Sequence, residues 1–294
     1  MQINLVINPV AGHGRTIRVL PRVRRTLEEE EVGLEIYRTE YPGHATEIVK
    51  DLEKEDGTLA VMGGDGTVRE VMNGLASTST PLGIVPAGMG NDLSRSLGVP
   101  RSIVEAARAV VHGKPVHIDM GADNGRLFNV MGVGFPSDVV ATFVTMRNGF
   151  FRGSLAYLAS VLRTLSSLET YELLLEIDGR KRECLSTAVF VMNSRYTGGG
   201  INLIPHADPT DGLLDVAIIK EVGRMELTLA LQSVYRGEHV DHPKIEFLKA
   251  SRIKIDAPEK MVKMIDGELE GITPAEIEIV PEARSVIVPA LKAG

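Results

Sequence analysis

The sequence predicts an α/β protein with a Rossmann-like N-terminal domain and a mainly antiparallel β-sandwich as its C-terminal domain. Three observations support this fold class. Strand and helix patterns alternate over residues 1–118, closely spaced strand patterns follow over 119–282, and a length of 294 residues suits two cores better than one. The tail of about 283–294 is expected to return to the first domain.

The first domain is predicted from a regular alternation of apolar runs and helical periodicity. The predicted strands cover 3–7, 34–39, 59–62 and 81–85, and the predicted helices cover 15–31, 45–54, 68–75 and 103–112. This alternation is typical of a parallel sheet with helices on its faces. The ligands of such sheets bind beyond the carboxyl ends of the strands.

The second domain is predicted from strand-like segments that follow each other closely. They cover 116–120, 127–132, 171–177, 186–193, 214–220, 245–250 and 252–256, and two helical inserts cover 155–168 and 224–235. The Asp178-Gly179 pair is a tight-turn signal, and the density of strands indicates an antiparallel sandwich. The insert 155–168 has three interpretations: core packing, the cover of a lipid pocket, or a homodimer interface.

The composition is that of a soluble globular protein, and we expect it to be cytoplasmic. Hydrophobic residues make up 44% and charged residues 24% of the chain, and the formal net charge of −7 argues against nucleic acid as a partner. The single cysteine, Cys184, excludes an intrachain disulfide and a multi-cysteine zinc site. No apolar segment reaches the roughly 20 residues that cross a bilayer, so any membrane contact is expected to be peripheral.

Three glycine-rich loops follow predicted strands of the first domain, at 8–15, 63–67 and 86–93. Several glycines in one loop let the backbone approach phosphate groups closely. Asp65 in the second loop would repel a bare triphosphate, so it is expected to act through Mg²⁺ or water. Asp92 in the third loop is expected to share a crevice with Asp65 or, alternatively, to cap the following helix.

Short motifs follow one another along nearly the whole chain. In the first domain they are Asn8-Pro9 with Gly12, Gly63-Gly64-Asp65-Gly66-Thr67 with Asn73-Gly74, and Gly88 with Gly90-Asn91-Asp92. In the second domain they are Gly132-Val133-Gly134-Phe135, Gly198-Gly199-Gly200, Pro205 with Ala207, Asp211-Gly212-Leu213-Leu214-Asp215 and Asp266-Gly267-Glu268. The ordered set resembles the diacylglycerol kinase catalytic family, which includes sphingosine and ceramide kinases.

The resemblance implies an ATP-dependent lipid kinase with two lobes and the nucleotide between them. Phosphoryl transfer needs positioning, charge neutralisation and a carboxylate that orients the attacking hydroxyl. By this match Glu268 would be the general base for the lipid hydroxyl, and Asp65 and Asp92 would organise Mg²⁺ and the phosphates. The nucleotide contacts would be Asn8, Thr39, Gly63, Gly64, Asp65, Gly66, Thr67, Val68, Arg69, Met89 and Asn91. Without the family pattern, Asp266-Gly267-Glu268 would be interpreted as a plain hairpin turn.

The resemblance also implies a second Mg²⁺ site on an acidic turn of the sandwich domain. It would consist of the Asp211 carboxylate and the main-chain oxygens of Asp208 and Leu213. Oxygen ligands on a turn suit a hard cation, whose role would be to hold the sandwich in shape. An acidic turn without a metal is the alternative.

Two residues depart from the family pattern. Met89 stands where threonine is usual, which removes a hydroxyl that could bond the nucleotide, and Arg69 stands where asparagine is usual, which adds a cation near the phosphates. Three functions are therefore considered. The leading one is a lipid kinase that converts diacylglycerol to phosphatidate in phospholipid metabolism. The others are a kinase for a soluble acceptor such as NAD and a nucleotide- or lipid-binding regulator with little catalysis.

Overall fold

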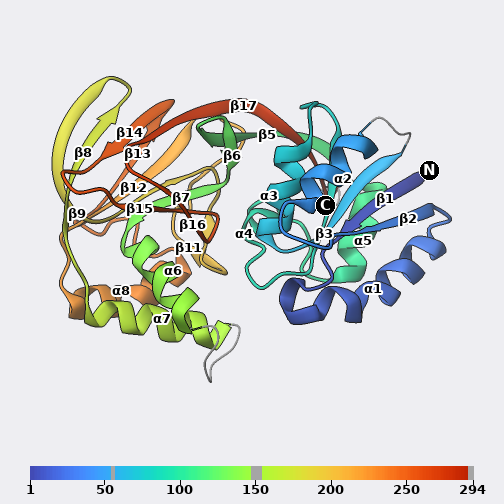
Figure 1. Cartoon of the computed structure of the whole chain (residues 1–294), viewed down its shortest axis with the longest axis horizontal. Helices are drawn as coiled ribbons and strands as arrows, with labels where there is room; N and C mark the ends of the chain where they lie inside the picture. Colours follow the sequence, from blue (N-terminus) through green and yellow to red (C-terminus); the bar gives the residue numbers. More distant parts are fainter. Residues whose placement is uncertain (54–56, 147–153, 291–294) are drawn as a thin grey trace. The chain divides into compact units, whose positions relative to one another are not determined.

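The computed structural model describes residues 1–53, 57–146 and 154–290 of the chain (Figure 1). The chain forms two compact units: residues 1–118 together with the chain from Glu282 onward, and Asp119–Pro281. Two strands, β5 (Lys114–Asp123) and β17 (Ala275–Val288), contain the points at which the chain passes from one unit to the other. Residues 291–294 of the predicted C-terminal tail lie outside the described residues.

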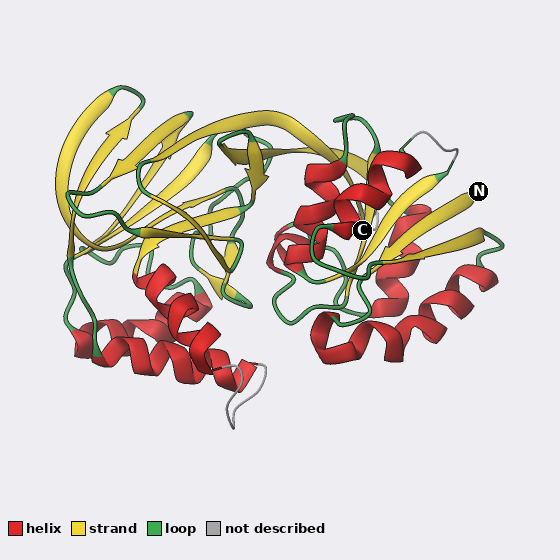
Figure 2. Cartoon of the chain, viewed as in Figure 1, coloured by secondary structure: helices red, strands yellow, loops and turns green. Residues whose placement is uncertain are grey.

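The first unit is a parallel sheet accompanied by helices (Figure 2). Its strands have the order β2 (Gly33–Arg38), β1 (Gln2–Ile7), β3 (Thr58–Gly63), β4 (Pro81–Pro86) and β17, and every neighbouring pair is parallel. β1, β3 and β4 are each buried over five consecutive residues. Continuous burial is typical of strands covered on both faces, so the α/β prediction for this part of the chain is confirmed.

The predicted helices of the first unit are present with shifted ends: α1 (Ala11–Glu29), α2 (His44–Leu52), α3 (Asp65–Gly74) and α5 (Ile103–His112). The short helix α4 (Asp92–Ser96) was not among the predicted elements. The first residues of α1 are irregular, because Gly12, His13 and Gly14 all have positive φ, so the regular helix begins near Arg15. The predicted helix 45–54 ends at Leu52 in the structure, and its residue 54 lies outside the described residues.

The second unit is an antiparallel β-sandwich, as predicted. Its longest strand path is β16 (Glu268–Ile272), β15 (Val262–Ile265), β7 (Val130–Gly134), β9 (Arg180–Met192), β8 (Tyr171–Ile177), β14 (Arg252–Asp256) and β17. β12 (Leu214–Lys220) pairs with both β9 and β13 (Ile245–Ala250), and β6 (Arg126–Phe128), β10 (Tyr196–Thr197) and β11 (Ile201–Asn202) are shorter. The Asp178-Gly179 turn joins β8 to β9 with positive φ at both residues, which confirms the predicted hairpin.

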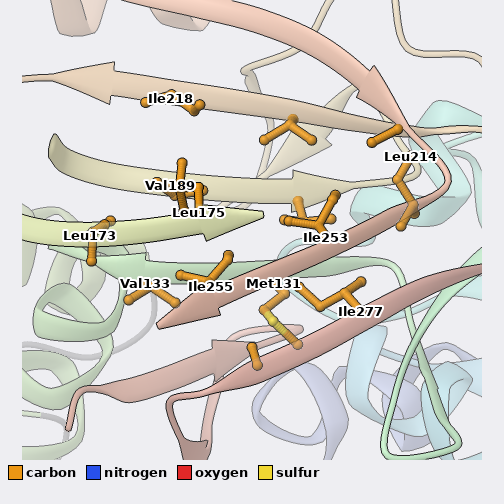
Figure 3. Packing of buried hydrophobic residues seen from close by; sticks show 14 of the residues in the cluster. Met131, Val133, Leu173, Leu175, Val189, Leu214, Ile218, Ile253, Ile255 and Ile277 are labelled. Atoms are coloured by element: carbon orange, nitrogen blue, oxygen red, sulfur yellow. The ribbon is translucent and has the colours of Figure 1, made fainter. Parts of the chain in front are cut away.

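Side chains that alternate along the strands divide the second unit into two apolar layers. Leu173, Leu175, Val189, Val191, Ile253 and Ile255 belong to the inner layer between strands (Figure 3). Successive strand residues point to opposite faces, so Ala188, Phe190 and Met192 of β9 lie in the other layer. That layer is covered by α6 (Phe135–Met146), α7 (Ser154–Ser166) and α8 (Arg224–Arg236).

Helix α6 was not predicted from the sequence. It is rich in β-branched residues, including Val139 and Val140, which favour strands. Pro136 and Asp138 in its first turn favour a helix start, and Val139 and Val140 pack in the apolar layer on the sheet. α7 and α8 match the two predicted inserts. Within the described ranges, no helix is both long enough and apolar enough to span a bilayer.

Candidate active site

Three glycine-rich loops of the first unit meet at the carboxyl ends of β1, β3 and β4, which are neighbours in the sheet. The second and third loops contact each other through their backbones. A Cβ atom on Gly88 would lie 2.4 Å from the Cα of Gly64, so this approach requires glycine. The N–H groups of Ala87 and Gly88 both donate to the carbonyl of Gly63, at 2.8 and 3.0 Å. The two loops therefore form one surface.

The first loop joins the other two through polar and steric contacts. Asn8 Nδ2 donates to Thr67 Oγ1 at 3.0 Å, and Asn8 Oδ1 accepts the N–H of Val10 at 3.1 Å. Gly12 has a φ of 57°, and a Cβ atom there would lie 2.3 Å from the carbonyl oxygen of Ala87. Thus the predicted residues Asn8, Thr67 and Gly63 lie together.

Asp65 connects the second loop to the third. Its two carboxylate oxygens accept the backbone N–H groups of Asn91 and Asp92, each at 2.7 Å. Burial raises the pKa of Asp65, while these two N–H donors oppose the rise. The carboxylate therefore fixes the start of α4, which is a positioning role that the sequence analysis did not foresee.

The third loop is closed by its own asparagine. Asn91 has a φ of 53°, and its side-chain amide both accepts from the Gly88 N–H and donates to the Gly88 carbonyl, at 2.9 Å each. Asp92 follows as the buried first residue of α4. Met89 is 50% exposed at the tip of the loop, so the side chain that replaces the usual threonine faces solvent.

The other predicted nucleotide contacts have different surroundings. Thr39 directly follows β2 and donates its N–H to the carbonyl of Ile7 at 2.9 Å, which ties it to the end of β1. Gly66 and Arg69 are partly exposed residues of α3. Val68 is buried, and its N–H donates to the carbonyl of Gly64 at 3.0 Å, so Val68 contributes to the first hydrogen-bonded turn of α3. That these residues contact a nucleotide stays a prediction.

In the second unit, Glu268 is an exposed residue at the start of β16, directly after the turn that joins β15 to β16. Asp266 and Gly267 have φ values of 47° and 84°, which is the backbone of a tight hairpin turn. The Asp266 carboxylate accepts the N–H groups of Asn129 at 3.1 Å and of Val130 at 2.8 Å. The hairpin that carries Glu268 is thus anchored to the start of β7.

A buried ion pair supports the same hairpin and was missed in the sequence. Lys263 of β15 pairs with Asp123 of β5, and their side chains are only 4% and 5% exposed. Desolvated charges are stable in the fold only when they are paired. No local signal relates residues this far apart along the chain.

The turn predicted to hold a second Mg²⁺ uses its carboxylates in other ways. Asp208 Oδ1 accepts from the Thr210 N–H and hydroxyl, at 3.0 and 2.7 Å. Asp211 forms an ion pair with the ammonium of Lys249, which also lies 3.5 Å from the buried carboxylate of Asp215. Within the described residues no group of three or more His, Cys, Asp or Glu side chains could hold a metal. The Lys249 ammonium already balances the Asp211 carboxylate, which favours the alternative of an acidic turn without a metal. That Asp211 and the main-chain oxygens of Asp208 and Leu213 bind Mg²⁺ stays a prediction.

A cavity of about 580 Å³ lies in the second unit. It is bounded by α6 at Ser137 and Asp138, by Tyr171 of β8 and by Leu269, the residue after Glu268. The Tyr171 hydroxyl donates to Asp138 Oδ2 at 2.7 Å. Burial raises the pKa values of both Asp138 and Tyr171. The only sequence signal of this cavity is the Gly132-Val133-Gly134-Phe135 motif that precedes Asp138.

Comparison with known proteins identifies the family. Residues 2–122 match the model of the diacylglycerol kinase catalytic domain, and residues 130–288 match that of the YegS C-terminal NAD kinase beta sandwich-like domain. A diacylglycerol kinase of Bacillus subtilis is 33% identical over 98% of this chain and 97% of its own length. The chain belongs to the diacylglycerol kinase family. The resemblance seen in the ordered motifs is therefore confirmed.

Other members of the diacylglycerol kinase family agree with this assignment. A diacylglycerol kinase of Staphylococcus carnosus is 31% identical over 92% of this chain and 90% of its own length. A crystal structure of a diacylglycerol kinase from Bacillus anthracis has a TM-score of 0.72 and 28% identity, covering 98% of this chain and 96% of that one. A second crystal structure from that organism has a TM-score of 0.82, with 29% identity over 98% of this chain and 95% of its own.

Proposed function

We propose that this member of the diacylglycerol kinase family transfers the γ-phosphoryl group of ATP to the free hydroxyl of diacylglycerol and releases phosphatidate. The observation that carries the proposal is the meeting of three glycine-rich loops at the carboxyl ends of adjacent parallel strands. Open α/β sheets bind nucleotides at this edge. Asn8, Thr39, Gly63, Gly64, Gly66, Thr67, Arg69, Met89 and Asn91 are the proposed nucleotide contacts, to which Val68 contributes through the backbone of α3.

The nucleotide side of the reaction depends on positioning. Mg²⁺ enters as the Mg·ATP substrate and neutralises phosphate charge during transfer. The N-terminus of α3, which begins at Asp65, favours anions through the helix dipole, because the first N–H groups of a helix have no partner within the helix. Asp65 keeps the third loop in place through the N–H groups of Asn91 and Asp92, so the phosphates meet a rigid surface. A rigid surface lowers the entropic cost of reaching the reactive geometry.

On the acceptor side, Glu268 is the proposed general base. Its carboxylate accepts the proton of the lipid hydroxyl while the hydroxyl oxygen forms a bond to the γ-phosphorus. The bond from the γ-phosphorus to the bridging oxygen breaks, and ADP leaves with that electron pair. The anchored Asp266 turn and the Lys263–Asp123 pair support the rigid hairpin that such a base needs.

The cavity bordered by Leu269, the residue after Glu268, favours an uncharged acceptor. Its described lining includes the carboxylates of Asp138, Glu169, Glu172 and Glu259 against one ammonium, that of Lys260. Such a lining repels the phosphate of an anionic lipid such as phosphatidylglycerol, and it offers hydrogen-bond acceptors to a hydroxyl. Diacylglycerol is uncharged and carries one free hydroxyl. It is therefore the acceptor that this lining favours over an anionic phospholipid.

The test is the phosphorylation of diacylglycerol in mixed micelles by the wild-type chain and by Glu268→Gln. General bases contribute about 10²- to 10⁴-fold to rates, so Glu268→Gln is expected to lower kcat by that factor and leave ATP binding intact. Glu276→Gln is the matched control, because Glu276 is an exposed glutamate on β17 that pairs only at the surface with Lys254. Wild-type activity in Glu268→Gln would exclude this base.

A further inference from the structure

The segment that follows β2 lies beside the first glycine-rich loop. β2 is the parallel neighbour of β1 (Figure 1), and Thr39 at its carboxyl end donates its N–H to the carbonyl of Ile7, the last residue of β1. The first loop leaves the same end of β1 at Asn8. Residues 39–44 therefore continue the row of loops along the edge of the sheet at which the nucleotide is proposed to bind.

Two aromatic rings of this segment are stacked on each other. The rings of Tyr41 and His44 are parallel to within 4°, and their centroids are 4.5 Å apart. Tyr41 is nevertheless 49% exposed. Because His44 covers one face of the Tyr41 ring, the exposed area includes the opposite face. The segment thus presents a flat aromatic surface at this edge of the sheet.

Hydrogen bonds fix both rings. The Tyr41 hydroxyl donates to Glu47 Oε2 at 2.6 Å, and the Glu40 N–H donates to Nδ1 of His44 at 3.1 Å. The backbone closes between the two rings, where the His44 N–H donates to the Tyr41 carbonyl at 3.2 Å. A ring that is held in place before binding loses little conformational entropy when a ligand stacks on it.

The start of α2 is also tied to α3, the helix that follows the second glycine-rich loop. The Ala45 N–H donates to Glu70 Oε2 at 3.3 Å, and the Thr46 hydroxyl donates to the Glu70 carbonyl at 2.8 Å. The stacked rings therefore keep a fixed position relative to the surface on which the phosphates are proposed to lie.

The separation of the strands suits the length of a nucleotide. The phosphates are proposed to lie at the start of α3, after β3, and β1 separates β3 from β2. Two strand spacings of about 4.8 Å put the end of β2 about 10 Å from the end of β3. An extended nucleoside triphosphate covers this distance between its phosphates and its base. With Thr39 as a proposed nucleotide contact, the base is directed toward residues 39–44.

We propose that the base of the nucleoside triphosphate stacks on Tyr41. The ring offers a large π surface without hydrogen-bond readout, so it favours the larger purine bases over pyrimidines and accepts adenine and guanine alike. Tyr41 is thereby a specificity-determining residue for the phosphoryl donor. The inference rests on the proposed function, because it requires a nucleotide at the three glycine-rich loops.

The test is isothermal titration calorimetry of Mg·ATP, Mg·CTP and Mg·tripolyphosphate, without a lipid acceptor. Tyr41→Ala is expected to raise the Kd of Mg·ATP at least about fivefold, because it removes the stacking surface. The Kd of Mg·tripolyphosphate, which has no base, should stay at the wild-type value. The wild type should bind Mg·CTP more weakly than Mg·ATP, and Tyr41→Ala should reduce this difference.

Two control variants separate the ring from other effects of the substitution. Tyr41→Phe keeps the ring and loses only the hydroxyl bond to Glu47, so its Kd for Mg·ATP should lie within about threefold of the wild-type value. Tyr235→Ala removes a tyrosine of similar exposure, 48%, from α8 of the second unit and should bind Mg·ATP as the wild type does.

The outcomes separate this inference from the proposed function. A wild-type Kd for Mg·ATP in Tyr41→Ala overturns the stacking role, and so does an equal rise of the Kd values for Mg·ATP and Mg·tripolyphosphate. Equal affinity of the wild type for Mg·CTP and Mg·ATP overturns the purine preference. Failure of the wild type to bind Mg·ATP overturns the proposed function together with this inference. The expected losses in a protein that phosphorylates no lipid would support the stacking role and contradict the proposed function alone.

Discussion

Arg284 of β17 holds the C-terminal end of α3, the helix that begins at the second glycine-rich loop. Its guanidinium is buried, and it donates from Nε to the carbonyl of Met72 at 2.5 Å and from Nη2 to that of Leu75 at 3.0 Å. The last carbonyls of a helix have no partner within the helix, so these two depend on Arg284. Arg284→Met keeps the length of the side chain but leaves both carbonyls buried without a donor.

We expect Arg284→Met to lower the free energy of unfolding by about 2–4 kcal/mol. Each buried acceptor that loses its partner destabilises the fold by about 1–3 kcal/mol. Part of this loss is offset, because the variant no longer has to desolvate the charge of Arg284 on folding. Burial lowers the pKa of Arg284, which is the sign of that desolvation. Urea unfolding at pH 7, followed by circular dichroism, measures the change. Arg101→Met, at an exposed arginine, is the control, and a loss below about 1 kcal/mol for Arg284→Met would refute the reasoning.

Three further predictions concern carboxylates. Burial raises the pKa of Glu53, but hydrogen bonds from the N–H groups of Ala76 and Ser77 outweigh burial, so the pKa in the folded state lies below its ordinary value. The stability that Glu53 contributes is therefore present above about pH 4.3 and is lost as pH falls through the folded-state pKa. Urea unfolding of Glu53→Gln should show a weaker acid dependence than that of the wild type. Lys249→Met should lower the free energy of unfolding by about 2 kcal/mol, while EDTA leaves the wild-type melting temperature unchanged; a drop with EDTA would show that a metal holds the turn. Asp65→Asn should reduce kcat at least tenfold, because an amide nitrogen would face a backbone N–H of the third loop; steady-state kinetics at full activity would exclude the positioning role.

The local pattern was sufficient to predict much of the fold. Apolar runs such as 59–62, and 3–7 with Asn4 as a polar residue inside it, predicted strands covered on both faces. The loops after these strands were expected to meet, because neighbouring parallel strands end at one edge of the sheet. Helix α6 was not predicted because its β-branched residues favour a strand. The helix is stabilised by packing on an apolar layer most of whose residues are far from α6 in the sequence, so no local pattern indicates it.

The candidate site was predictable in its residues more than in their roles. The glycines and aspartates of the loops are visible in the sequence. The two hydrogen bonds that the Asp65 carboxylate accepts come from the N–H groups of Asn91 and Asp92, which are 26 and 27 positions further along the chain, and no local pattern predicts them. The pairing of Lys249 with Asp211 and that of Lys263 with Asp123 also depend on strand register. No local pattern indicates which cation a carboxylate will meet across a sheet.

The most direct test of the central claim is transfer of labelled γ-phosphate from Mg·ATP by the wild-type chain to a panel of acceptors. The panel contains diacylglycerol and phosphatidylglycerol in mixed micelles, and NAD in solution. Asp65→Ala is the inactive control. The account predicts label on diacylglycerol, little on phosphatidylglycerol, and loss of the label in the control. Label on NAD alone, or on no acceptor at all, would contradict it.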